Sequence, residues 1–424
     1  MTEAFLQYVW RHRLLEGPLT TTEGLPVVVE RAGELNRDAG PDFFDARVTI
    51  DGIRWAGNVE IHVRASDWKA HHHSEDKKYN NVILHVVYIH DADVVLENGK
   101  TVATVAVADN IPEHVWENYE ELMSSEESIA CSSRLERIPD FLMHISQERL
   151  TVERMERKTD DARRLLDEAR GSWEKACYWF TARYFGGKTN AFAFELLAKK
   201  TPMTIVAKKK DNPFRIESLY FGQAGLLEGD FDDEYPRAMQ REYSYLRAAY
   251  NLRPMDGHLW KFFRLYPASF PTLRISQFAC LMARSHGLFS KLLESRDVRE
   301  LRLLFDVETS DYWQTHYIYD NESRVRSRKL GKMAIDRLLI NAWAPLLFEY
   351  GVMHDDQSRK DQAFALLRQL PAERNKIISL WENAGVKPSN AAESQALIEL
   401  YNEYCMKKRC LECQLGGRVL KIGR

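Results

Sequence analysis

The chain has 424 residues, of which 45% are hydrophobic and 29% are charged, so it is long enough to bury a large core and to form two or three domains. Its formal net charge of -3 excludes a uniformly basic protein that coats nucleic acid, and leaves room for a local basic groove. No run approaches the roughly 20 apolar residues of a membrane span. We therefore expect a cytoplasmic protein without a membrane partner, and its oligomeric state stays open.

The predicted elements begin with a helix and continue with a sheet. At the N-terminus, apolar residues such as Phe5, Val9 and Trp10 recur at helical spacing. From residue 25 to about residue 108, short runs rich in Val and Ile alternate with turn pairs such as Asp51-Gly52, which is typical of strands. After residue 111, apolar residues recur every three or four positions over long stretches, which predicts helices.

This change of pattern predicts an α+β fold, in which a small mixed β-sheet domain at the N-terminus precedes a large all-helical region. We place the sheet domain over residues 1–110 and a helical connection over residues 111–150. A helical domain follows over residues 151–424 and ends in a cysteine cluster. The sequence shows no internal repeat of fixed period.

Two acids flank a predicted hairpin in the stretch GPDFFDARVTIDGIRWAGNVEIHV. Asp42 precedes the first strand, and Glu60 shares one face of the second strand with His62, because side chains alternate along a strand. The turn folds the second strand back on the first, so we expect Asp42 beside Glu60 and His62. Two carboxylates this close repel each other unless a divalent cation neutralises them, and oxygen ligands suit Mg²⁺ or Mn²⁺. We therefore predict Asp42 and Glu60 as metal ligands.

Histidines are dense after this hairpin, with six of the protein's 13 histidines in residues 60–90. We predict that His71 and His73 flank the metal or a scissile phosphate. For His72 a solvated loop is the simpler interpretation. His85 lies in an otherwise apolar strand, where a histidine is more often a hydrogen-bonded core residue than a ligand.

The acid pair resembles the PD-(D/E)xK nuclease core, in which an acid after a proline and an acid two residues before a lysine flank a hairpin and bind the catalytic metal. Pro41-Asp42 matches the first element, and Glu60-Ile61-His62 matches the second with histidine in place of lysine. The family's lysine activates water and offsets transition-state charge, a role open to His62 as imidazolium or as a neutral base. In that family a helical acid often precedes the motif, here Glu3 or Glu16. The resemblance implies a catalytic site of Asp42, Glu60, His62, His71 and His73.

Longer stretches along the chain carry a second resemblance. They include FRIESLYFGQAGLL, LWKFFRLYPASFPTLRISQ, LLINAWAPLLFEYG and YCMKKRCLECQLGGRVL. These stretches are similar to a family of bacterial proteins, mainly from the Bacteroidota, that is catalogued as a domain of unknown function. This resemblance covers nearly the whole chain and implies no activity, so the functional prediction rests on the site residues.

Two arginines lie near prolines that break a helical pattern in FFRLYPASFPTLRISQF. Guanidinium groups bind phosphates through paired hydrogen bonds, so we predict Arg264 and Arg274 as contacts to a nucleic-acid backbone. The alternative is that both arginines pair with carboxylates inside a helical bundle.

The C-terminal end carries three cysteines in the pattern C-x4-C-x2-C. Three thiolates at this spacing suit one metal centre, and the spacing equals that of the first three ligands of a plant-type iron–sulfur site. We predict that Cys405, Cys410 and Cys413 bind a structural zinc ion or an iron–sulfur cluster, against the alternative of three separate thiols. The fourth ligand stays open among Cys131, Cys177, Cys280 and a histidine.

The function predicted from these patterns is that of a metal-dependent phosphodiesterase, a nuclease acting on DNA or RNA. One alternative is a metal-dependent hydrolase of a small phosphorylated or amide substrate, with His71 and His73 as metal ligands. A second is a non-catalytic scaffold that binds nucleic acid or protein, which the replacement of lysine by His62 favours. Binding of Mg²⁺ or Mn²⁺ would favour the nuclease, zinc the small-molecule hydrolase, and no metal the scaffold.

Overall fold

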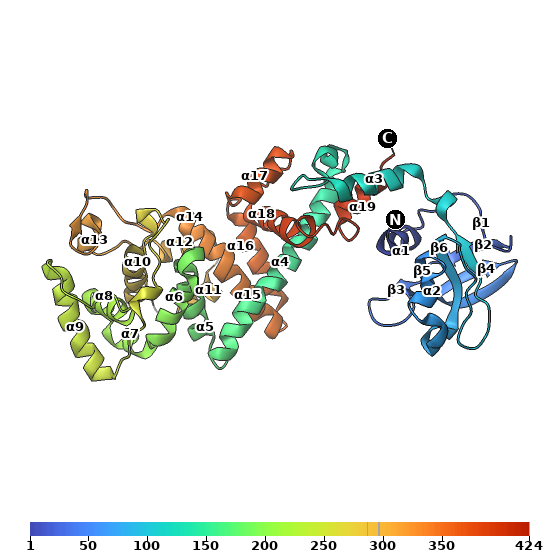
Figure 1. The fold of residues 1–424 in the computed structure, drawn as a ribbon. Helices are drawn as coiled ribbons and strands as arrows, with labels where there is room; N and C mark the ends of the chain where they lie inside the picture. The colour runs from blue at the N-terminus through green and yellow to red at the C-terminus, as the bar shows by residue number, and fades with distance from the viewer. Residues whose placement is uncertain (286, 296, 424) are drawn as a thin grey trace. The chain divides into compact units, whose positions relative to one another are not determined.

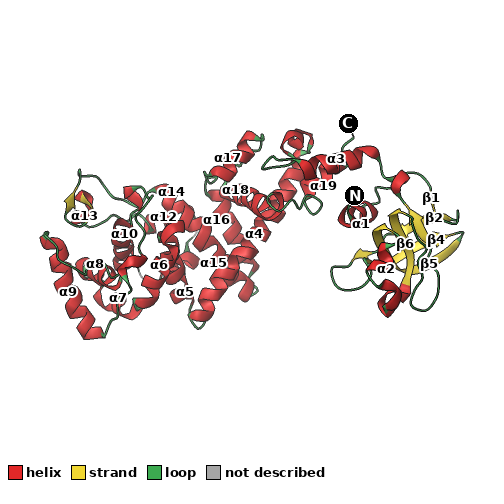
Figure 2. Ribbon diagram, in the orientation of Figure 1, coloured by secondary structure: helices red, strands yellow, loops and turns green. Residues whose placement is uncertain are grey.

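The computed structural model describes residues 1–285, 287–295 and 297–423, and the chain divides into two compact units. The sheet unit comprises Met1–Ser146 and Leu400–Arg424, and the helical unit comprises Gln147–Glu399. Strands gather in the sheet unit and helices fill the helical unit (Figures 1 and 2), so the predicted α+β class is confirmed. The sequence analysis placed the C-terminal segment in a helical domain, whereas the structure groups it with the N-terminal residues.

The sheet has seven strands in the order β1-β2-β4-β5-β6-β7, with β3 paired to β4 beside this path. β4 and β5 form an antiparallel hairpin about Asp51-Gly52, where φ values of 51° and 76° match a two-residue hairpin turn. β6 runs parallel to β5, and β7 runs parallel to β6. The strands are β1 (Leu19–Thr20), β2 (Pro26–Arg31), β3 (Glu34–Leu35), β4 (Phe43–Ile50), β5 (Ile53–Arg64), β6 (Val82–Ile89) and β7 (Thr104–Ala106).

Helix α1 (Glu3–Arg11) packs against β5 and closes the core of the sheet unit. Its apolar face contributes Leu6 and Trp10 to a buried cluster with Val59 and Ile61 of β5. The crossover from β5 to β6 contributes Trp68 and Tyr79 to a second, smaller cluster. The other helical elements of this unit are α2 (Asp67–Ala70), η1 (His73–Glu75), η2 (Lys77–Asn81), η3 (Ala108–Asn110), α3 (Glu113–Ser124), η4 (Ser132–Arg137), the π-helix η8 (Leu400–Cys405) and α19 (Gln414–Leu420).

The helical unit is built around one large core of apolar side chains. The division between the units falls within α4 (Asp140–Glu168). No helix of the described residues is long and apolar enough to cross a membrane. The remaining elements are α5 (Trp173–Phe185), α6 (Gly187–Lys200), α7 (Met203–Lys209), α8 (Pro213–Gln223), α9 (Glu234–Tyr250), η5 (Gly257–Leu259), η6 (Pro267–Ser269), α10 (Pro271–Arg284), α11 (Leu288–Glu294), α12 (Val298–Leu304), α13 (Asp311–Thr315), β8 (His316–Ile318), β9 (Asn321–Glu322), α14 (Lys332–Leu338), the π-helix η7 (Leu339–Trp343), α15 (Ala344–Met353), α16 (Gln357–Gln369), α17 (Lys376–Asn383) and α18 (Ala391–Glu399).

Two buried carboxylates of the helical unit, Glu399 and Glu349, are paired with arginines. Glu399 is 3% exposed and accepts hydrogen bonds from Arg157 Nη2 at 2.6 Å and from Arg154 Nη1 at 3.1 Å. Glu349 is fully buried and accepts from Arg163 Nε at 2.7 Å. Each of these two buried carboxylates therefore has a cationic hydrogen-bond donor.

Candidate functional site

The pairing of β4 with β5 brings the two predicted acids together. Phe43 pairs with Val59, which places Asp42 beside Glu60. The Asp42 amide donates to Glu60 Oε2 at 3.0 Å, and the Ile61 amide donates to Asp42 Oδ2 at 3.0 Å. Each carboxylate is therefore held by the backbone of the opposite segment, as the alternation of side chains and the hairpin turn predicted.

This acid pair is largely removed from water and has no basic partner. Glu60 is 5% exposed, and Asp42 accepts from Gln7 Nε2 at 2.9 Å. Burial, followed by the charge of Glu60, raises the pKa of Asp42 to about 7. Among the described residues, no lysine or arginine forms an ion pair with either acid. A bound divalent cation would offset both the repulsion between the two carboxylates and the cost of burying their charge.

His62 lies at the centre of a histidine cluster beside the acids. It is 1% exposed, with Nδ1 at 2.9 Å from His85 Nε2 and Nε2 at 3.2 Å from His71 Nδ1. Burial, followed by the neighbouring His85, lowers the pKa of His62 far below its usual value. This environment favours the neutral imidazole, which suits the role of a base or a metal ligand better than that of an imidazolium.

Three imidazole nitrogens and a carboxylate oxygen converge at this point. His62, His71 and His73 each present a ring nitrogen, and the three nitrogens lie within 4.8 Å of one another. His73 Nε2 lies 3.2 Å from Glu60 Oε1, and His62 Nε2 lies 3.5 Å from the same oxygen. His73 Nε2 is buried and forms no hydrogen bond. Such a mixed nitrogen and oxygen donor set suits a transition-metal ion.

The crossover between β5 and β6 holds these histidines in place. The His73 ring stacks on Tyr79 with centroids 3.8 Å apart, and Trp68 packs edge-on against His73 at 5.4 Å. Asp67 Oδ2 accepts from the Arg64 amide at 2.8 Å, and Asp76 caps η2. These acids orient the backbone of the crossover, and the aromatic rings fix the imidazole of His73.

Helix α1 supplies two polar groups to the site. Gln7, which donates to Asp42, and Glu3 lie one helical turn apart. Burial raises the pKa of Glu3, and His71 lowers it in part, so Glu3 interacts with the histidine cluster. Glu16, the other helical acid considered, lies beyond the end of α1. The sequence analysis did not identify Gln7. Its position four residues after Glu3, on the same face of the helix, is the pattern that could have indicated it.

His85 also belongs to the cluster, although a core position was the simpler prediction for it. It is fully buried, its Nε2 contacts His62, and its Nδ1 has no hydrogen bond. His85 is therefore placed to orient the ring of His62 rather than to bind an ion itself.

The arginines predicted to contact nucleic acid lie in the helical unit. Arg264 is exposed, whereas Arg274 of α10 lines a cavity of about 260 Å³ together with Lys188 and Arg337. Burial, followed by the neighbouring Arg337, lowers the pKa of Arg274 to about 10. In the part of the chain that the structure describes, neither Arg264 nor Arg274 forms an ion pair, and Arg274 donates to Gln277 Oε1 at 3.2 Å. The cavity therefore gathers three cationic side chains.

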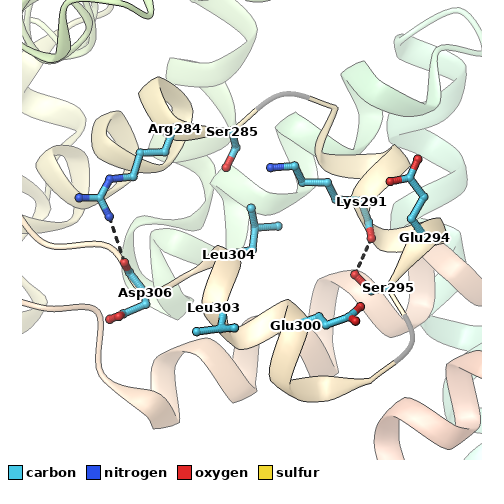
Figure 3. Close-up of a pocket in the computed structure, with 9 residues that line it drawn as sticks. All are labelled: Arg284, Ser285, Lys291, Glu294, Ser295, Glu300, Leu303, Leu304 and Asp306. Carbon is cyan, nitrogen blue, oxygen red and sulfur yellow. Dashed lines mark hydrogen bonds between the residues drawn. The ribbon is translucent and has the colours of Figure 1, made fainter.

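Figure 3 shows a larger cavity of about 450 Å³ in the helical unit, where cations and acids are mixed. Arg284 Nη1 donates to the Asp306 carbonyl at 3.3 Å, and Lys291 faces the same space as Glu294 and Glu300. Among its described lining residues three acids outnumber two cations, which gives no preference for an anion, so the size of this cavity alone does not make it a functional site.

The mixed sheet, the buried acid pair and the converging imidazoles define an α+β protein with a candidate metal site. The chain belongs to the family described as "Protein of unknown function (DUF2851)", whose model matches residues 3–376. The matched range includes the acids, the histidine cluster and Arg274, and it ends before Cys405. No curated protein and no solved structure matches the chain. The resemblance to the nuclease core stays a prediction.

Proposed function

We propose that the protein is a metal-dependent phosphodiesterase that cleaves nucleic acid at the site of Asp42 and Glu60. The observation that carries the proposal is a largely buried pair of acids that has no lysine or arginine partner among the described residues and lies beside three imidazole nitrogens. Oxygen donors alone suit Mg²⁺ or Mn²⁺, and the added nitrogen donors favour Mn²⁺. The ion would be held by Glu60, His62, His71 and His73. The nearby Asp42 carboxylate would help to neutralise the charge of the ion.

The bound ion would polarise the phosphate and lower the pKa of an attacking water. Gln7 and the Ile61 amide fix the Asp42 carboxylate, which keeps its charge directed at the site. His62 is neutral and fully buried, so it acts as a ligand or a base and supplies no positive charge. His71 is the exposed member of the cluster, so the ion that it helps to hold can be reached by water and substrate.

Two features support nucleic acid as the substrate class. The antiparallel hairpin followed by a parallel strand carries an acid after a proline and an E-x-H triplet, as the nuclease-core resemblance implies. The cavity of Lys188, Arg274 and Arg337 offers paired donors that suit phosphate oxygens.

A second candidate function is a zinc-dependent hydrolase of a small phosphorylated or amide substrate. The close approach of the nitrogens of His62, His71 and His73 favours it, because three histidines are a common ligand set of catalytic zinc. The third possibility raised by the sequence, a non-catalytic scaffold, predicts that no divalent ion binds at the acid pair.

The test is cleavage of single-stranded and double-stranded DNA and RNA by the purified protein with Mg²⁺, Mn²⁺ or Zn²⁺. We expect cleavage with Mn²⁺ that falls about a hundredfold or more in Asp42→Asn and in Glu60→Gln. Glu75→Gln is the matched control, because Glu75 is exposed in the same crossover. Hydrolysis of only a small phosphodiester with Zn²⁺ would select the second candidate, and binding of nucleic acid without cleavage would select the scaffold.

A further inference from the structure

Four cysteines from distant parts of the sequence gather in the sheet unit. Cys131 precedes η4, Cys405 ends η8, and Cys410 and Cys413 lie in the turn before α19. Cys131 and Cys413 are each 9% exposed, and the other two are partly buried. These four are the cysteines of the sheet unit. The other two cysteines of the chain, Cys177 and Cys280, belong to the helical unit.

All six pairs among these four thiols are close enough to interact electrostatically. Burial, followed by Cys413 and Cys410, raises the pKa of Cys131 to about 12. Burial, followed by Cys131, Cys413 and Cys410, raises the pKa of Cys405. Burial and Cys413 raise the pKa of Cys410 to about 11. The four thiols, from two distant segments of the chain, therefore lie near one another, which is the arrangement that a shared metal centre requires.

Packing fixes the segments that carry the cysteines. α19 contacts both α3 and η4, and the Asn118 side chain of α3 donates to the carbonyls of Val419 and Leu420 at 3.2 Å. Lys408 Nζ donates to the carbonyls at the end of α3, Met123 at 2.8 Å and Ser125 at 2.7 Å. The turn from Cys405 to Cys413 is therefore held against the segment that leads to Cys131.

The turn itself is tight around Cys410. A side chain at Gly416 would bring its Cβ to 2.3 Å from the Cys410 carbonyl oxygen, so α19 begins directly on the backbone of this cysteine. Only glycine permits this approach, which holds the first turn of α19 close to Cys410.

We propose that Cys131, Cys405, Cys410 and Cys413 are the four ligands of an iron–sulfur cluster of the [4Fe–4S] type. Cys131 completes the C-x4-C-x2-C pattern from before the helical unit. Four cysteine thiolates are the ligand set of such clusters.

The spacing of the sulfur atoms selects a cluster over a single zinc ion. Zinc holds four sulfurs at ~2.3 Å in a tetrahedron, which places the sulfurs about 3.8 Å apart. In residues 1–285, 287–295 and 297–423, the only group of three or more candidate ligands within 4.8 Å of one another is that of His62, His71 and His73. In every set of three of these thiols, at least one pair of sulfurs therefore lies farther apart than a single zinc ion requires, which leaves room for a larger group such as a cluster.

The cluster would join the two chain segments of the sheet unit. Its first ligand, Cys131, precedes the helical unit (Gln147–Glu399) in the chain, and the other three ligands follow that unit. α19 is also tied to α1, because Tyr8 donates through its hydroxyl to the Gly417 carbonyl at 3.1 Å. Tyr8 is the neighbour of Gln7, which holds Asp42. Loss of the cluster would therefore loosen the C-terminal segment and, through α1, the acid pair.

The test begins with the full chain expressed and purified without oxygen and reconstituted with iron and sulfide. We expect iron and acid-labile sulfide in equal amounts, about four of each per chain, with the visible absorption of iron–thiolate charge transfer. Native mass spectrometry of the wild type then gives the mass of the bound group without any substitution.

Two variants and a control assign the ligands. Cys131→Ser and Cys410→Ser are each expected to lose most of the iron, whereas Cys280→Ser, whose thiol lies in α10, is expected to keep it. Zinc in place of iron, a wild type that holds neither iron nor sulfide, or a Cys131→Ser variant with the full iron content would each overturn the proposal. Iron content is independent of nuclease activity, so the outcome does not depend on the proposed function.

Discussion

Glu399 of the helical unit and Asp42 of the sheet unit respond in opposite ways to the burial of a carboxylate. In the helical unit, burial alone would raise the pKa of Glu399, but Arg157 and Arg154 lower it below its usual value. In the sheet unit, Asp42 and Glu60 have each other and three imidazoles as neighbours, and the pKa of Asp42 rises to about 7. A buried charge needs a partner. The helical unit supplies that partner from its own sequence, and we infer that the sheet unit takes it from solution as a metal ion.

The largest expected effect concerns metal binding at Glu60. Mn²⁺ is expected to stabilise the wild type by about 2.7 kcal/mol at a concentration a hundred times its Kd. Glu60→Gln replaces the carboxylate beside His62 and His73 with a neutral amide, a far weaker metal ligand, so this stabilisation should vanish together with cleavage. Thermal unfolding with and without Mn²⁺ measures it. Equal stabilisation of the wild type and the variant by Mn²⁺ would contradict the inference that the sheet unit takes a metal ion as the partner of its buried acids.

The second effect tests the helical unit by removing the acid at Glu399. Glu399→Gln leaves Arg154 and Arg157 without their counter-charge, and we expect a loss of about 2 to 3 kcal/mol. This value is below that of a fully buried pair because Arg157 is partly exposed. Urea unfolding gives the free energy, and Mn²⁺ should not alter the loss. The exposed Glu234→Gln, whose partner is Arg241, is the control and should change stability by less than about 0.5 kcal/mol.

A third, smaller effect comes from Lys158, which lies near Arg154 and donates to the Asn341 side chain. Burial, followed by Arg154, lowers the pKa of Lys158 to about 7. The unfolded chain then binds more protons than the folded one between this pKa and the usual lysine value of about 10.4, so stability should rise with pH across that window. We expect a rise of about 1 to 2 kcal/mol after allowance for residual solvation.

Urea midpoints between pH 7 and pH 10 measure this dependence. Lys158→Met should flatten the curve, and Lys77→Met, at an exposed site of the sheet unit, should leave it unchanged. If Lys158→Met retains the wild-type slope, another group carries the titration.

The smallest effect concerns the basic cavity. Arg274→Gln and Arg337→Gln are each expected to weaken binding of nucleic acid a few-fold and to reduce the slope of log K against log salt by about one. Fluorescence anisotropy at several salt concentrations gives both values. Arg284→Gln, from the cavity of mixed charge, is the matched control. An unchanged salt slope in both cavity variants would remove this cavity from the proposed interface.

The parts of the site that follow local rules were accessible from the sequence. Asp42 lies beside Glu60 because the period of a strand and the Asp51-Gly52 turn fix their register. Gln7 was not found, because its contact with Asp42 depends on how α1 packs on β5. The fourth cysteine beside the three C-terminal ones was not identified either, because it depends on tertiary packing. Cys131 is separated from those three in the chain by the whole helical unit.

The division of the sheet unit into Met1–Ser146 and Leu400–Arg424 has a consequence for synthesis on the ribosome. The strands and α1 emerge first, and the docking partner of Asn118 emerges only after every residue of Gln147–Glu399 has been translated. The helical unit is a continuous segment, so it folds as the chain emerges. The sheet unit must wait for its final helix while its apolar surface stays open to chaperones.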